Sequence, residues 1–466
     1  MNYSFSLDRN NTKVHMVGIG GISMSGLAEI LMHKDVKITG SDIHESEITD
    51  KLKSMGATIY PSHDARNIDD QSLVVYTAAV SQDNPELVEA RNRGIPVIER
   101  ADLLGAIMDQ FNECIAVSGT HGKTTTTSMV SSITLEAGLD PTIHVGGILD
   151  MIGGNTRIGN SSYFIAEACE YKDSFLKFRP TLAIILNIDA DHLDYFRDID
   201  HIRSSFEGFI ANVRNPGLVV LNLDDPQTKN LAKVLTRPTI TYGLNSHEAD
   251  WTAENIAFKE GYAHFTAFYQ KAFWGNIQLS VPGLHNVSNA LAAISACNAL
   301  GISKSAIIKG LAHFKGTHRR LEDKGTLHGV RVMDDYAHHP TEIQATLSAA
   351  RSLATGKLIC VFQPHTYTRT HELLDDFSRA FAQADTVVVT DIYAAREKDT
   401  GLINSRILTE RINMNTGNAV YISRFEDIVK FLLDNASSGD LVLTMGAGSI
   451  YRAGELYLDS KTSNAS

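Results

Sequence analysis

The chain has 466 residues, 42 of them basic and 54 acidic, so its formal net charge at pH 7 is −12. This length predicts about three domains, each able to bury its own core, and the acidic balance excludes a general nucleic-acid-binding surface. We find no apolar leader-like segment, no run of membrane-spanning length and no C-x-x-C pair. We therefore expect a cytoplasmic enzyme that binds neither nucleic acid nor membrane and carries no structural zinc or disulfide framework.

Short β-branched runs alternate along the chain with segments of helical spacing. The alternation begins with a strand-like run at 14–20, restarts at 115–118 and restarts again at 331–335. This rhythm is typical of βαβ units, so it predicts an α/β protein with parallel sheets.

Residues 249–281 differ from the rest because they are rich in aromatic residues and alternate in polarity. That pattern predicts an antiparallel insertion rather than another βαβ unit. We place boundaries near Met108 and Gly316. The expected domains are residues 1–108, 109–316 and 317–466.

The first glycine-rich segment, G-I-G-G-I-S at 18–23, directly follows a predicted strand, and Asp42 ends the next strand. Glycines there allow the diphosphate of a nucleotide to approach a helix N-terminus, and an acid at the second strand end suits a ribose hydroxyl. A dinucleotide fingerprint would have glycine where this chain has Ser23, so the ligand need not be NAD. A tight turn without a ligand is the alternative.

The second glycine-rich segment, A-V-S-G-T-H-G-K-T-T-T-T at 116–127, predicts a phosphate-binding loop. Gly119 and Gly122 let backbone N–H groups face an anion, and a helix beginning at Lys123 adds its positive dipole end. Lys123 can bind the outer phosphates of ATP, and Thr124 can bind Mg²⁺. The full P-loop pattern fails because Val117 stands where its first glycine would be. The alternative is an ordinary turn that caps a helix.

Two further polar groups follow predicted strands of the same domain. Glu167 lies in A-E-A-C-E, and His192 lies in D-A-D-H-L-D. Because the carboxyl ends of parallel strands converge, both could face the same Mg²⁺ as Thr124. Taken singly, each could instead be a loop or helix-capping residue.

Together, several motifs in order along the chain resemble the Mur ligases of peptidoglycan synthesis. Besides the two glycine-rich segments they are D-H-L-D (191–194), P-G-L-H-N-V-S-N-A (282–290), R-R-L-E (319–322), D-D-Y-A-H-H-P-T-E-I (334–343), F-Q-P-H-T-Y-T-R-T (362–370) and G-A-G-S-I (446–450).

The resemblance implies a Rossmann-like N-terminal domain for a UDP-sugar, a central P-loop-type ATPase domain and a Rossmann-like C-terminal domain that brings the amino acid. It also implies ATP- and Mg²⁺-dependent ligation of L-alanine to the lactyl carboxylate of UDP-N-acetylmuramic acid through an acyl phosphate. The protein would be a monomer or a homodimer.

The resemblance assigns candidate residues to five roles. Catalysis is assigned to Lys123, Glu167, His192 and Arg320. The metal ligands are Thr124, Glu167 and His192. ATP binding is assigned to Gly119, Thr120, His121, Gly122, Lys123, Thr124, Thr125, His285, Asn286, Asn289, Arg320 and Asp335. UDP-sugar binding is assigned to Gly18, Gly20, Gly21, Ser23 and Asp42, and amino-acid binding to Tyr336, His338, His365 and Arg369.

The chain departs from the family pattern at two of these sites. Thr366 stands where many relatives have arginine, which leaves Arg369 as the expected partner of the alanine carboxylate. Cys169 stands where aspartate is common, although Glu167 and Glu170 on either side are retained.

Three alternatives stay open on sequence alone. A recycling ligase of the same superfamily would attach a preformed peptide to the same sugar nucleotide. An NAD-dependent oxidoreductase would use the first domain, although Ser23 and the phosphate loop argue against it. A catalytically silent ATP-binding scaffold would not need the retained lysine, glutamate, histidine and arginine.

Overall fold

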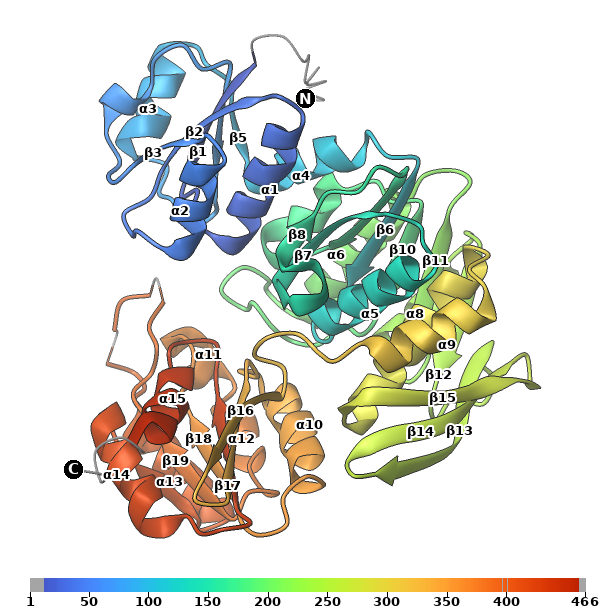
Figure 1. Ribbon diagram of the computed structural model, residues 1–466, viewed down its shortest axis with the longest axis vertical. Helices are drawn as coiled ribbons and strands as arrows, with labels where there is room; N and C mark the ends of the chain where they lie inside the picture. The colour runs from blue at the N-terminus through green and yellow to red at the C-terminus, as the bar shows by residue number, and fades with distance from the viewer. Residues whose placement is uncertain (1–11, 396, 400, 461–466) are drawn as a thin grey trace.

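The computed structural model describes residues 12–395, 397–399 and 401–460. It contains three β-sheets in chain order, each flanked by helices, and so confirms the predicted α/β fold (Figure 1). Among the described helices, none combines the length and hydropathy needed to cross a bilayer.

The N-terminal unit contains a parallel five-stranded sheet in the order β3-β2-β1-β4-β5. Its register aligns Val17 of β1 with Ser41 of β2 and Tyr76 of β4, which brings the ends of these strands to one edge. The elements are β1 (Lys13–Val17), α1 (Ile22–His33), β2 (Lys37–Ser41), α2 (Glu47–Ser54), β3 (Thr58–Tyr60), η1 (Ala65–Asn67), β4 (Leu73–Tyr76), α3 (Pro85–Asn92), β5 (Val97–Glu99) and α4 (Arg100–Met108).

The central unit contains a ten-stranded sheet in the order β15-β14-β13-β12-β11-β10-β6-β9-β7-β8. Its core strands are parallel, whereas β13, β14 and β15 pair antiparallel, which confirms the predicted change of pattern at 249–281. The elements are β6 (Glu113–Ser118), α5 (Lys123–Glu136), β7 (Thr142–Leu149), η2 (Asp150–Ile152), β8 (Gly154–Arg157), β9 (Tyr163–Glu167), η3 (Tyr171–Lys177), β10 (Leu182–Ile185), α6 (Ile199–Ala211), β11 (Leu218–Asn222), α7 (Pro226–Val234), β12 (Thr239–Gly243), β13 (Trp251–Lys259), β14 (Tyr262–Tyr269), β15 (Ala272–Pro282), α8 (Leu284–Ala299) and α9 (Lys304–His313).

The C-terminal unit contains a six-stranded sheet in the order β16-β17-β21-β18-β19-β20, parallel except for the pair β16 and β17. The elements are β16 (Glu322–Leu327), β17 (Val330–Asp335), α10 (Pro340–Arg351), β18 (Leu358–Phe362), α11 (Tyr367–Glu372), α12 (Leu374–Arg379), β19 (Thr386–Val389), α13 (Ser405–Asn415), β20 (Ala419–Tyr421), α14 (Phe425–Asn435), β21 (Leu441–Met445) and α15 (Tyr451–Asp459).

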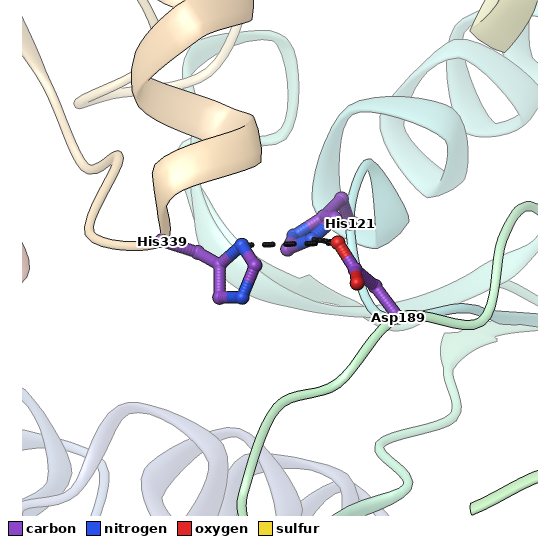
Figure 2. Close-up of side chains that lie close together, drawn as sticks. All are labelled: His121, Asp189 and His339. Carbon is purple, nitrogen blue, oxygen red and sulfur yellow. Dashed lines mark hydrogen bonds and ion pairs between the residues drawn. The ribbon is translucent and has the colours of Figure 1, made fainter. Parts of the chain in front are cut away.

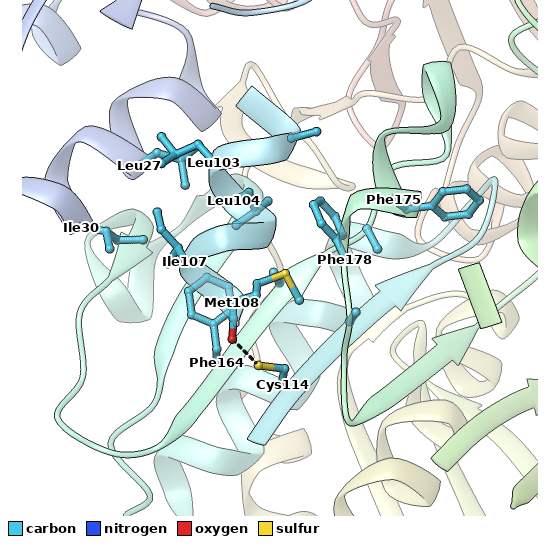
Figure 3. Packing of buried hydrophobic residues seen from close by; sticks show 14 of the residues in the cluster. Leu27, Ile30, Leu103, Leu104, Ile107, Met108, Cys114, Phe164, Phe175 and Phe178 are labelled. Atoms are coloured by element: carbon cyan, nitrogen blue, oxygen red, sulfur yellow. Dashed lines mark hydrogen bonds between the residues drawn. The ribbon is translucent and has the colours of Figure 1, made fainter. Parts of the chain in front are cut away.

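The hydrophobic cores join the first two units but not the third. One cluster includes Leu27 and Ile30 of α1, Leu104 of α4 and Phe164 of β9, so apolar packing continues across the junction between the N-terminal and central units (Figure 3). The two clusters of the C-terminal unit contain only residues from 321 onward. The C-terminal unit meets the central unit through polar contacts and through α10, which lies against α8.

Candidate active site

The phosphate loop connects β6 to α5, and α5 begins at Lys123 as predicted. Gly119 and Gly122 have φ values of +142° and +84°, in the region that favours glycine. Asn187, just after β10, holds the loop by accepting from the N–H groups of Thr120 (3.1 Å, backbone O) and His121 (2.8 Å, Oδ1). These hydrogen bonds fix the shape of the loop.

Lys123 folds back over this loop. Its ammonium group donates to the carbonyl oxygens of Gly119 and Thr120 and to both carboxylate oxygens of Glu170, at 2.9 and 3.1 Å. Burial by itself lowers the pKa of Lys123, but the Glu170 carboxylate outweighs burial and raises the pKa. Lys123 is thus a permanent cation at the mouth of the loop, with Glu170 as its counter-ion.

Two of the three candidate metal ligands are neighbours at the ends of β9 and the loop. Glu167 accepts from the N–H of Gly146 at 2.6 Å and shares a hydrogen bond with the side chain of Thr124. Burial raises the pKa of Glu167. A hydroxyl and a carboxylate side by side are oxygen donors of the kind that Mg²⁺ requires, so these residues fit that ion.

The third candidate, His192, lies beside Glu170. Its Nε2 is 3.8 Å from Glu170 Oε1, and its ring packs on Tyr171 with 4.6 Å between centroids. His192 has a positive φ of 56°, a strained conformation of the kind that is often found at functional sites. The structure therefore brings Glu170 into this cluster, between Lys123 and His192.

A cavity of about 580 Å³ opens beside the loop, between the central and C-terminal units. Eight of the predicted ATP-binding residues line it, from both units: His121, Gly122, Thr125, His285, Asn286, Asn289, Arg320 and Asp335. Its size suits a nucleotide.

Asp335, a predicted ATP-binding residue, is hydrogen-bonded to the backbone of its own unit. Its two carboxylate oxygens accept from the backbone N–H groups of Leu321 and Ala337, each at 2.8 Å, and burial raises its pKa to about 6. Asp335 therefore shapes the connection between the two units as well as lining the cavity.

The predicted amino-acid residues gather at the neighbouring edge of the C-terminal unit. His338 packs near Tyr336 and His365, with 5.4 and 5.7 Å between ring centroids. Burial lowers the pKa of His338 to about 4, so its ring is neutral at pH 7. Arg369 Nη1 contacts His365 Nδ1 at 3.1 Å.

Arg369 also crosses to the central unit. Its Nε and Nη2 donate to Asp191 Oδ1 at 3.0 and 2.8 Å, and both side chains are about nine-tenths buried. Burial raises the pKa of Asp191, but the Arg369 charge outweighs it and holds the pKa well below its usual range. The guanidinium is therefore held in one orientation, with its Nη1 side toward His365.

Thr366, which replaces an arginine common in relatives, has a structural part here. It is the N-cap of α11, where its hydroxyl accepts from Arg369 N at 3.4 Å, and its φ is 65°. The departure from the motif thus caps the helix that carries Arg369.

The glycine loop of the N-terminal unit precedes α1, with Gly21 as the N-cap. Asp42 accepts from Gly20 N at 2.9 Å and from His44 N at 3.0 Å, so its carboxylate supports the loop. The hydroxyl of Ser23 contacts His144 Nε2 and accepts from Arg100 Nη1, both at 2.8 Å. Arg100 therefore brings a guanidinium to the helix N-terminus that we expected to hold a diphosphate.

Five polar residues at these sites were absent from our predicted site residues: Arg100, Glu170, Asp189, Asp191 and Glu342. Four of them lie inside motifs given above, but each of those motifs contains more than one acidic residue, and the sequence does not show which of them belongs to the site. Arg100 lies outside every quoted motif and had no such signal.

Models of the Mur ligase family match three successive parts of the chain. They are described as the catalytic domain (residues 13–112), the middle domain (117–297) and the glutamate ligase domain (319–448). A UDP-N-acetylmuramate–L-alanine ligase of Acetivibrio thermocellus is 58% identical, over 98% of this chain and 97% of its own.

Solved structures that are similar over nearly the whole chain include the following two. The UDP-N-acetylmuramate-alanine ligase of Thermotoga maritima has a TM-score of 0.83 and 30% identity, covering 97% of this chain and 100% of its own. A murein peptide ligase of Psychrobacter arcticus has a TM-score of 0.75 and 26% identity, covering 98% of this chain and 100% of its own.

Proposed function

This chain belongs to the Mur ligase family, and we propose that it is an ATP-dependent ligase that joins L-alanine to the lactyl carboxylate of UDP-N-acetylmuramic acid during peptidoglycan precursor synthesis. A curated relative of that name, 58% identical over nearly the full length, supports the substrate assignment. ATP and the UDP-sugar are cytoplasmic metabolites, so we place the reaction in the cytoplasm.

One observation carries the proposal beyond family membership. A continuous series of side-chain contacts of 2.8–3.9 Å runs from the phosphate loop to the candidate alanine site, from Lys123 through Glu170, His192 and Asp191 to Arg369. It connects a group suited to the γ-phosphate with a group suited to an amino-acid carboxylate. A ligase that activates one substrate with ATP and then adds an amino acid needs these two groups together.

In the first step, an oxygen of the lactyl carboxylate attacks the γ-phosphoryl group of ATP, forming an acyl phosphate and releasing ADP. Lys123 and Arg320 stabilise the charge on the transferred group by position and charge alone. Thr124, Glu167 and His192 are the residues that would hold Mg²⁺, which when bound neutralises phosphate charge. The N-terminal end of α1, with Ser23 and Arg100, would hold the diphosphate of the UDP-sugar.

In the second step, the alanine ammonium group loses a proton to solvent and the free amine attacks the acyl carbon. The acyl C–O bond then breaks, inorganic phosphate leaves with its electron pair, and the nitrogen releases a second proton to solvent to give the amide. Arg369 would bind the alanine carboxylate through Nη1, which does not contact Asp191 and would exchange its contact with His365 for the carboxylate. The neutral ring of His338 adds no positive charge that would repel the incoming ammonium group. The polar contacts between the units keep these groups together while the acyl phosphate exists.

The test is phosphate release from ATP and Mg²⁺ with a grid of UDP-sugars and amine substrates. We expect turnover only when UDP-N-acetylmuramic acid and L-alanine are both present, because the acyl phosphate advances only when an amine attacks it. UDP-N-acetylglucosamine lacks the lactyl carboxylate and is the matched control. Equal turnover with that sugar would exclude the proposal.

The same grid separates the recycling alternative. A relative from Neisseria meningitides is named for L-alanyl-γ-D-glutamyl-meso-diaminopimelate, so this tripeptide replaces L-alanine in one arm. Faster turnover with the tripeptide than with L-alanine would assign the chain to recycling.

A further inference from the structure

We propose that His121, Asp189 and His339 form a second metal site, which takes a borderline divalent transition-metal ion such as Zn²⁺ and joins the central unit to the C-terminal unit. His121 comes from the phosphate loop, Asp189 from the segment after β10, and His339 from the residue that caps α10. Figure 2 shows the three side chains converging from these elements.

The ligand atoms are spaced as a small coordination sphere requires. One atom from each residue lies within 4.8 Å of the others. His121 Nε2 is 3.3 Å from Asp189 Oδ2, and His339 Nδ1 is 3.9 Å from the same oxygen. Ligand–metal distances of about 2.0–2.1 Å in a tetrahedral site place neighbouring ligand atoms about 3.3 Å apart.

The outer contacts of both histidines turn their other ring nitrogens toward Asp189, although His339 Nδ1 also accepts from Thr341 N. Glu342 Oε1 lies 3.2 Å from His121 Nδ1, so a proton on Nδ1 faces a carboxylate and Nε2 points toward Asp189. His339 Nε2 donates to the carbonyl oxygen of Ala190 at 3.2 Å, which leaves the lone pair of Nδ1 directed inward. A carboxylate or carbonyl behind each imidazole is the usual support of a metal-bound histidine.

Charge also favours a divalent ion. The carboxylates of Asp189 and Glu342 lie 3.3 and 3.2 Å from the two ring nitrogens of His121. A divalent ion at this position would balance their two negative charges. The ion must displace two 3.3 Å hydrogen bonds, one from Thr341 N to His339 Nδ1 and one between His121 Nε2 and Asp189 Oδ2. Asp189 Oδ2 also accepts from the Thr341 hydroxyl at 2.8 Å.

The donor set distinguishes this site from the Mg²⁺ candidate. Two imidazole nitrogens and one carboxylate favour Zn²⁺ and its neighbours in the transition series, whereas Thr124 and Glu167 supply only oxygen. The site also needs both units, because His339 lies beyond the connection between them. A bound ion would therefore hold the units closed and slow any step that requires them to separate.

The test is Co²⁺ binding to the full-length, chelator-treated protein without nucleotide, with excess Mg²⁺ present to fill oxygen sites. Co²⁺ absorbs visibly when histidine-bound at low coordination number, and Zn²⁺ displaces it. We expect one Co²⁺ per chain, and we expect His339→Gln to weaken binding at least about 10-fold. Asp189→Asn should do the same and is the second variant in case His339→Gln does not fold.

Two further variants test whether Co²⁺ binds elsewhere in the protein. His318→Gln is the matched control, because His318 also lies between two carboxylates of different units, Asp150 at 2.7 Å and Glu322 at 3.2 Å. His192→Gln removes the histidine of the Mg²⁺ candidate. Both should bind Co²⁺ as the parental protein does.

The proposal is overturned if the parental protein takes up no Co²⁺, if both cluster variants bind as tightly as the parent, or if only His192→Gln loses the ion. A second readout is Zn²⁺ inhibition of turnover, expected in the parental enzyme and reduced in His339→Gln. That readout rests on the proposed function, whereas the binding measurement does not, so the two can fail separately.

Discussion

At the scale of single residues, the charged groups of the site are held by partners before substrate arrives. Glu170 is 2% exposed and holds the ammonium group of Lys123 against the loop carbonyls. Asp191 holds the guanidinium of Arg369 in the same way from another unit. Each cation is thereby oriented in advance, which reduces the entropy lost when an anionic substrate binds.

We expect Lys123→Ala to lower kcat at least ~100-fold, as for the loss of one preorganised electrostatic group. The change leaves Glu170 buried and unpaired, so the protein should also lose stability. Adding Glu170→Gln should restore stability without restoring turnover. Steady-state kinetics at saturating ATP and thermal unfolding measure the two effects, with the exposed Lys309→Ala as the control. Near-parental turnover of Lys123→Ala would refute its assigned role.

We expect Arg369→Ala to lower kcat/KM for alanine about 10- to 100-fold, because a hydrogen bond to a charged group contributes roughly 1.5–3 kcal/mol. Asp191→Asn should lower the same parameter, since asparagine still accepts from His192 N but no longer offers a charge to the guanidinium. In the double variant, kcat/KM for alanine should fall by less than the product of the two single-variant factors, because both substitutions act through the Arg369 guanidinium.

Thr341→Val is the control for this pair. It removes the 2.8 Å hydrogen bond from Thr341 to Asp189 across the same interface, yet leaves Arg369 untouched. An Arg369→Ala variant with weakened ATP binding and an unchanged KM for alanine would place this arginine at the phosphates instead.

At the scale of elements, α1 packs on β7 and β8 around a buried polar group. His144 contacts Ser23 of α1 through Nε2 and Thr156 of β8 through Nδ1, at 2.8 and 3.1 Å. Burial, together with the charge of Arg100, lowers the pKa of His144 to about 3. The histidine is therefore neutral in the folded protein at every pH near neutrality.

The lowered pKa of His144 predicts that acid destabilises the junction between the N-terminal and central units. Below the unfolded-state pKa of about 6.5 the unfolded chain binds a proton that the folded protein excludes, so stability is lost as pH falls from 6.5 toward 3. By pH 5 the loss should be about 2 kcal/mol. Denaturant unfolding of His144→Gln should show a shallower pH dependence than the parent or the exposed His33→Gln. Parallel slopes for all three proteins would contradict it.

At the scale of the whole molecule, the N-terminal and central units share an apolar core, whereas the C-terminal unit has its own. We therefore expect two calorimetric transitions. Leu104→Ala should lower the midpoint temperature of the transition that unfolds the N-terminal and central units, and Phe362→Ala that of the C-terminal unit. Each variant should lower the free energy of unfolding of its own part by about 2–5 kcal/mol. One transition lowered by both variants would show that the polar interface couples all three units.

Features that depend on local backbone requirements could be predicted from the sequence alone. The start of α5 at Lys123 follows from glycines that adopt positive φ, and the antiparallel strands within 249–281 follow from alternation in polarity. These patterns were sufficient because strand alternation and glycine turns are encoded within a few neighbouring residues.

The pairing of charged groups depends on the fold of the whole chain and could not be predicted from the sequence. Asp191 and Arg369 are 178 positions apart, and Asp189 is 152 positions from Thr341, so no local pattern pairs them. The core that joins α4 to the central unit could not be predicted either, because an apolar residue has the same sequence pattern whichever unit it packs against. Ion pairs and core packing form between surfaces, and those surfaces exist only after each sheet has folded.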